Sequence, residues 1–84
     1  MSRTSPRAAR PGGALISAQV VQTLLAELRT GRYASAARLP PELTLARTLG
    51  VSRSVVRDAL GELERAGYVE RVRGIGTLVN RGAL

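Results

Sequence analysis

The sequence predicts a small domain of the mainly α, α+β class, with three helices, one short strand and a C-terminal β-hairpin. Apolar residues recur at helical spacing in three separate segments, and two segments rich in Val, Thr and Tyr follow the last of them. Glycine or proline stands between most of these segments, where it favours a turn. With 84 residues, the chain is long enough for one small domain.

Residues 14–80 are predicted to form this domain, and residues 1–13 a disordered basic arm, because Ser, Pro, Gly and arginine dominate the arm. The first helix is expected over residues 15–30, where apolar positions recur every four residues: Ile16, Val20, Leu24 and Leu28. Gly31 then stands where a helix-ending glycine is expected. Arg38 and Leu39 are candidates for a very short strand before the next helix.

A second helix is expected to open at Pro40-Pro41, since proline suits a first helical turn, and to run through residues 42–49. Gly50 permits the left-handed conformation of a tight turn. Ser52 is placed to cap a third helix, over residues 52–66, by accepting a hydrogen bond from a backbone N–H. The predicted buried side of this pair is apolar: Leu45, Ala46, Leu49, Val51, Val55, Val56, Ala59, Leu60 and Leu63. Two short helices joined through a glycine-containing turn form a helix-turn-helix.

Residues 68–72 and 77–80 are predicted to be the two strands of the hairpin. Gly67 ends the third helix, and the segment 73–76 between the strands is a loop that contains glycine. A helix-turn-helix followed directly by such a hairpin is a winged helix-turn-helix. Residues 81–84 are expected to begin a linker to a further domain.

The charge of the chain indicates an anionic partner. The formal net charge is +7, and arginine supplies all 13 basic residues. On so small a domain this excess favours nucleic acid or a membrane surface. Two tyrosines are the whole aromatic content, which argues against proteins that stack single-stranded bases on aromatic rings. Neither a membrane span nor a secretory signal is recognisable, so a cytoplasmic protein is expected.

The side chains needed for most catalytic and metal sites are missing. The chain has no cysteine and no histidine, which removes thiolate and imidazole ligands and the commonest acid–base group at neutral pH. Gly74-x-Gly76-Thr77 superficially resembles a phosphate-binding loop, but no helix follows it. We therefore expect no enzymatic activity, no metal and no cofactor.

The chain resembles the DNA-binding domain of GntR-family bacterial transcription regulators over roughly residues 15–80. Four blocks carry the resemblance: Leu39-Pro40-x-Glu42-x-x-Leu45-Ala46, GVSRSVVRDAL at residues 50–60, the exit segment 63–69, and Gly74-x-Gly76-Thr77-x-Val79. Ser35-Ala36 replace the usual Pro-Gly, which suggests a looser turn there. Pro41 replaces a frequent serine, and Leu43 stands where an arginine that contacts DNA is common, so that contact is not transferred.

The resemblance implies sequence-specific binding of duplex DNA by a regulator expected to act as a repressor, with helix 52–66 in the major groove of a palindromic operator half-site. Arg53 and Arg57 are implied to read bases. Ser52 is expected to contact a phosphate as well as cap the helix. The complete set of expected DNA-binding residues is Ser52, Arg53, Ser54, Arg57, Arg47, Arg71, Arg73 and Gly74.

The resemblance also implies partners beyond DNA. Regulators of this family carry a C-terminal domain that binds a small-molecule effector and forms a homodimer. That domain is absent from these 84 residues, so the chain is expected to be a fragment, and a monomer in isolation.

Other interpretations stay open from the sequence. Arg57 with Glu62 and Arg53 with Asp58 would form an ordinary solvated face, although residues five apart meet poorly on a helix. The fold also serves as a protein-interaction module, and a basic domain can bind RNA or any nucleic acid without sequence preference. A salt-dependent preference for duplex DNA over RNA would separate these classes.

Overall fold

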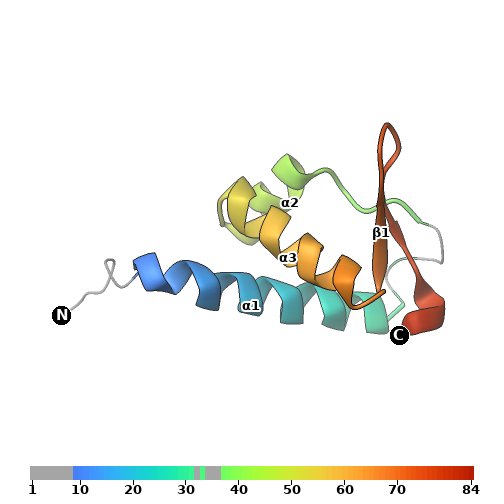
Figure 1. The fold of residues 1–84 in the computed structure, drawn as a ribbon, viewed down its shortest axis with the longest axis horizontal. Helices are drawn as coiled ribbons and strands as arrows, with labels where there is room; N and C mark the ends of the chain where they lie inside the picture. Colours follow the sequence, from blue (N-terminus) through green and yellow to red (C-terminus); the bar gives the residue numbers. More distant parts are fainter. Residues whose placement is uncertain (1–8, 32, 34–36) are drawn as a thin grey trace.

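The computed structural model describes residues 9–31, 33 and 37–84. Within them the order is α1 (Ala9–Arg29), α2 (Glu42–Leu49), α3 (Arg53–Arg65), β1 (Val69–Val72), β2 (Gly76–Val79) and a 3-10 turn at Arg81–Ala83. In Figure 1, α1 lies along the long axis, α2 and α3 lie on one side of it, and the hairpin stands upright with its loop directed away from α1. This is the predicted winged helix-turn-helix.

The helix α1 is longer than predicted, because it begins at Ala9 and not at residue 15. Residues 9–13 therefore belong to a helix, and the prediction that they form part of a disordered arm is wrong. Pro11 is tolerated because it lies in the first turn, where its missing N–H has no partner within the helix. Residues 1–8 and the Ser35-Ala36 turn lie outside the described residues.

The turn between α2 and α3 forms as predicted. Gly50 is left-handed, with φ 72°, and its N–H donates to the carbonyl of Ala46. The N–H of Val51 donates to the same carbonyl over 3.0 Å, which satisfies the end of α2. The helix α2 covers the predicted residues 42–49, with Pro41 as its cap, and the carbonyl of Pro41 accepts from the N–H of Leu45 at 2.9 Å.

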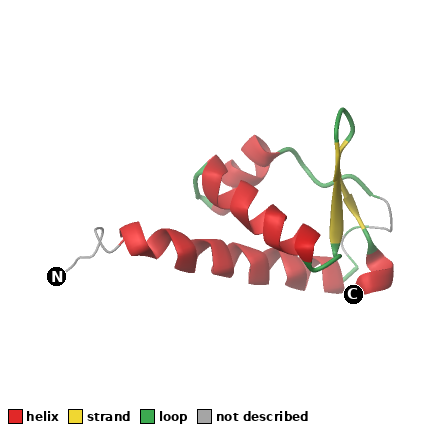
Figure 2. Cartoon of the chain, in the orientation of Figure 1, coloured by secondary structure: helices red, strands yellow, loops and turns green. Residues whose placement is uncertain are grey.

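The strands β1 and β2 form an antiparallel hairpin (Figure 2). Val69 lies opposite Val79, and Val72 lies opposite Gly76. The predicted short strand is a single bridge between Arg38 and Leu78. Leu39 N–H donates to the carbonyl of Thr77 over 2.8 Å, which ties the segment before α2 to the hairpin. The segment before α2 is therefore hydrogen-bonded to β2.

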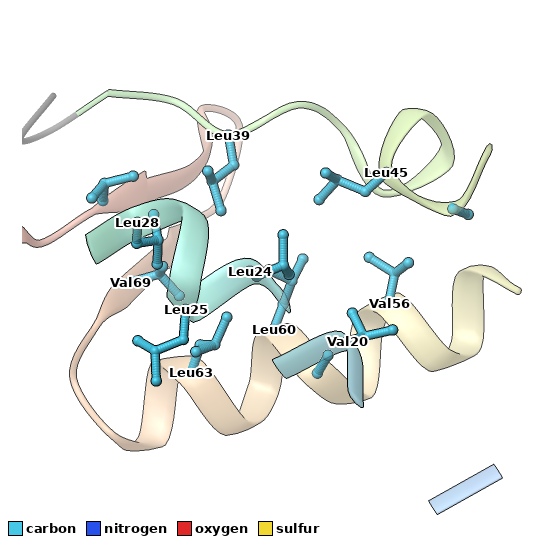
Figure 3. Close-up of a cluster of buried hydrophobic side chains, with 13 residues drawn as sticks. Val20, Leu24, Leu25, Leu28, Leu39, Leu45, Val56, Leu60, Leu63 and Val69 are labelled. Carbon is cyan, nitrogen blue, oxygen red and sulfur yellow. The ribbon is translucent and has the colours of Figure 1, made fainter. Parts of the chain in front are cut away.

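One apolar core joins the helices to the hairpin (Figure 3). α1 packs against α3, α2 packs against α3, and α3 contacts β1. The largest fully buried side chains come from α1 and α3: Leu24, Leu28, Val56, Leu60 and Leu63. Because the core takes one whole face of α3, the opposite face is left for solvent or a partner.

Residues 81–84, which were expected to begin a linker, fold back onto the domain. The Arg81 guanidinium is part-buried, and its Nη1 donates to the carbonyls of Leu28 at 2.7 Å and Tyr33 at 3.2 Å. A cation is favourable there because the C-terminus of a helix carries partial negative charge. Leu84 also packs against the core. The folded unit therefore includes these residues.

Candidate nucleic-acid interface

The first two turns of α3 present an exposed cationic face. The side chains of Arg53 and Arg57 are 57% and 55% exposed, whereas Val56 between them is fully buried. Ser52 is the N-cap, and its Oγ accepts from the N–H of Val55 at 3.2 Å, as predicted. Ser54 is exposed beside the arginines. The hydrogen-bond donors of this face belong to the two guanidinium groups and to the backbone at the start of α3.

One carboxylate from α2 links the two arginines. Glu42 Oε1 lies 3.3 Å from Arg57 Nη2, which donates a hydrogen bond to it, and 3.9 Å from Arg53 Nη2. Arg57 and Arg53 therefore pair with Glu42. In the described part of the chain, they do not form the pairs with Glu62 and Asp58 that the sequence left open. Glu42 is far from both arginines in sequence, so helical spacing gave no sign of this contact.

The predicted wing residues divide into two positions. Arg71 lies in β1 opposite Thr77, one residue pair from the loop. Its Nε donates to Glu64 Oε1 at 3.0 Å, and its backbone N–H donates to Glu64 Oε2 at 3.1 Å. Its Nη2 lies 3.5 Å from the point where a Cβ on Gly61 would stand, so the guanidinium lies against α3 at this position. Arg73 and Gly74 lie in the exposed loop, and Gly74 has φ 80°.

A cleft of about 440 Å³ separates the hairpin from the start of α2. Ile75, which is 49% exposed, lines it from the loop. The charged residues that line the cleft are Arg38, Glu42, Arg71 and Arg73. Three of these four are cations, so the cleft suits an anionic chain that passes between the wing and the start of α2.

Arg47 lies apart from this cleft, in the last turn of α2. Its side chain is exposed, and a basic residue suits the negative end of the helix. Its position is compatible both with a phosphate contact and with simple solvation.

Glu64 has a pKa below its ordinary value of 4.5. The main cause is the hydrogen bond from the backbone N–H of Arg71, followed by the hydrogen bond from the Arg71 guanidinium. Both bonds favour the charged carboxylate. The charged form of Glu64 therefore holds strand β1 of the wing against α3.

We expect this contact to weaken in acid. Because the pKa is lowered in the folded state, the stabilisation is present above the unfolded pKa and is lost as pH falls through the folded value. The difference in free energy of unfolding between the parent and Glu64→Gln should therefore shrink as pH falls below 4.5. Urea unfolding at several pH values measures it, and Glu70→Gln controls for the loss of one negative charge. If this difference stays constant as the pH falls, the charge of Glu64 does not stabilise the fold through Arg71.

Sequence reasoning missed the roles of Glu42 and Arg81. Glu42 was identified only as a motif residue, and Arg81 only as part of a linker. Both act through contacts between segments distant in sequence, with Arg57 and Leu28 respectively. Among the described residues, no group of three or more carboxylates could hold a metal ion. No described helix is long and apolar enough to cross a membrane.

Comparison with curated proteins points to one family. The model of bacterial regulatory proteins of the gntR family matches residues 16–79. The arabinose metabolism transcriptional repressor of Geobacillus stearothermophilus is 36% identical over 63 residues, covering 75% of this chain and 17% of that protein. The histidine utilization repressor of Pseudomonas aeruginosa is 35% identical over 80 residues, covering 93% of this chain and 32% of that protein. The chain thus spans a third or less of these relatives.

Solved structures agree in fold. The DNA-binding domain of AraR in complex with operator ORR3 superposes with a TM-score of 0.73 at 33% identity, covering 76% of this chain and 77% of that one. A GntR family transcriptional regulator from Listeria monocytogenes gives a TM-score of 0.75 at 30% identity, covering 79% and 58%. The family match, the relatives and the fold agree, and the chain belongs to the gntR family of bacterial regulatory proteins.

Proposed function

We propose that this domain binds double-stranded operator DNA sequence-specifically, as the DNA-binding part of a transcription regulator that acts as a repressor. The observation that carries the proposal is the pair of exposed guanidinium groups, Arg53 and Arg57, in the first two turns of α3. A helix in the major groove presents its N-terminal residues to base edges. Arginine pairs with O6 and N7 of guanine through two hydrogen bonds.

The remaining predicted residues take supporting roles in the proposed complex. Ser52 and Ser54 lie beside the arginines, and the start of α3 favours a phosphate. Arg73 and Gly74 would reach the adjacent minor groove or the backbone, since both lie in the exposed loop of the wing. Arg47 and Arg71 would contact phosphates. Arg71 would do so from its position on Glu64, because its guanidinium keeps further donors beyond the Nε bond.

The cleft between the wing and α2 supports this placement. Its arginines would follow the sugar–phosphate strand that separates the major groove from the next minor groove. Phosphate contacts fix the register of a protein on DNA, whereas base contacts give specificity.

For the whole protein we propose a homodimer that binds two half-sites of a palindrome, with an effector domain that changes the dimer geometry when it binds a small molecule. The relatives are several times longer than this chain, and two of them are named repressors. Two-fold symmetry of a dimer matches two-fold symmetry of an operator. The family consists of regulatory proteins, and we propose action in the cytoplasm without catalysis or a cofactor.

The test is selection from a random duplex pool at physiological salt. The domain is fused to a dimerising coiled coil, because linking two domains raises the effective affinity. We expect enrichment of a palindrome. If each domain neutralises about four phosphates, the logarithm of affinity should fall with the logarithm of salt at a slope of about −3.6 per domain.

Two outcomes would contradict the proposal. Folded fusion protein that binds duplex DNA with this salt dependence but enriches no sequence would be a non-specific binder. Folded protein that does not bind duplex DNA would instead favour a protein-interaction module.

A further inference from the structure

Glu42 raises a physical question that the proposed DNA contacts do not answer. Its carboxylate lies among arginines on the surface proposed to face DNA. A negative charge there repels phosphates and offsets part of the attraction of the guanidinium groups. If affinity for DNA were the whole function of this face, a neutral residue would serve better.

Fold stability does not explain the contact well. The two arginine side chains are more than half exposed, and exposed ion pairs contribute little to stability. Glu42 is the first residue of α2, where a negative charge favours the helix. That effect requires a charge at this position, but it does not require the carboxylate to reach two arginines of another helix.

The geometry restricts the two arginines in different degrees. Arg57 donates a hydrogen bond to Glu42 at 3.3 Å, while Arg53 lies 3.9 Å from the same oxygen. Arginine loses considerable side-chain entropy when it is held in one rotamer. A carboxylate that holds one Nη of Arg57 reduces the further loss on binding and leaves other N–H donors free for a base edge. The Glu42 side chain is itself only 26% exposed, so it has less room to move than either arginine.

We propose that Glu42 is a positioning residue that sets the sequence specificity of the domain. It holds Arg57, and less tightly Arg53, in the orientation that reads bases, and it opposes their movement to nearby phosphates. On a wrong sequence the arginines gain most by turning to the backbone, and Glu42 then loses its partners beside the phosphates. The inference rests on the proposed DNA binding and adds a residue that discriminates between sequences.

The test compares the parent with Glu42→Gln and Glu42→Asp in the dimerised fusion. Dissociation constants are measured on the selected operator and on a scrambled duplex of the same composition. Glu42→Gln removes the charge, and Glu42→Asp keeps it at the start of α2 but shortens its reach. Glu62→Gln, at an exposed position on α3, controls for the loss of one negative charge.

We expect the ratio of the two dissociation constants to fall about tenfold in Glu42→Gln, the size of one charge-assisted contact. Binding to the scrambled duplex should tighten, because one repulsive charge is gone. Glu42→Asp should lose a similar part of the ratio although its net charge is unchanged. Glu62→Gln should tighten both duplexes together and keep the ratio.

A second measurement needs no DNA. In the free chain, ¹⁵N relaxation of the Arg57 Nε–H group should show larger motion in both Glu42 variants than in the parent, with Arg47 unchanged as the internal control. Thermal unfolding confirms that each variant is folded.

Each other outcome overturns the inference in a different way. A parental ratio in Glu42→Asp would show that Glu42 acts as a helix-terminus charge, and a parental ratio in Glu42→Gln would show that it has no part in specificity. If the parent itself fails to distinguish the two duplexes, the proposed function fails, and the inference fails with it.

Discussion

Replacing Leu60 with alanine is expected to lower the free energy of unfolding by about 2–5 kcal/mol, the usual range for a buried leucine. Leu60 is 1% exposed and lies in the core between α1 and α3, among Leu24, Val56 and Leu63. Truncation leaves a cavity that this packing can close only in part. The total free energy of unfolding of a native protein is roughly 5–15 kcal/mol. The substitution would therefore remove a large part of it. Urea unfolding followed by circular dichroism measures it.

Leu43→Ala is the matched control. Leu43 is 42% exposed on α2, and substitutions at exposed positions usually change stability by less than about 0.5 kcal/mol. If both variants unfolded at the same urea concentration, the core assignment of Leu60 would be wrong. A loss at Leu43 equal to that expected at Leu60 would show that α2 buries a face that this fold leaves open.

The fold was predictable because its signals are local. Gly50 forms the left-handed turn, Ser52 caps α3, and the stripe that includes Val56 and Leu60 is buried, all as predicted from neighbouring residues. Capping, glycine conformation and helical periodicity each depend on a few adjacent residues. They can therefore be recognised in a single sequence. The wrong boundary of α1 has the same basis. A Pro-Gly-Gly segment argues against a helix, but proline near a helix start is tolerated.

The candidate site was predictable only in part. The exposed position of Arg53 and Arg57 follows from the apolar stripe on the opposite face of α3. The partner of Arg57 does not, because Glu42 comes close only after α2 and α3 cross at the Gly50 turn. The same limit applies to Arg71, which is held by Glu64 across the end of α3. Periodicity places a residue on a face but gives no information about which residue of another element meets it.

Arg57→Ala is expected to weaken operator binding by about 1–3 kcal/mol, or roughly 5- to 150-fold in Kd. It should also relax the preference at one base position, because a guanidinium that pairs with guanine supplies discrimination as well as affinity. Selection repeated with the variant fusion, together with Kd values on the parental operator, measures both effects. Arg47→Ala is the control: loss of a phosphate contact should weaken all sequences alike and reduce the salt slope by about 1.

The two variants distinguish base recognition from a phosphate contact only if both stay folded. Arg57 is 55% exposed, and its ion pair with Glu42 lies at the surface, so its removal should change the free energy of unfolding little. A loss of binding in Arg57→Ala at parental stability therefore belongs to the interface and not to the core. Unchanged affinity and an unchanged selected sequence would remove Arg57 from the reading face. A uniform loss on every duplex, like that expected of Arg47→Ala, would make Arg57 a phosphate contact, and base reading would then have to come from Arg53 and the neighbouring serines.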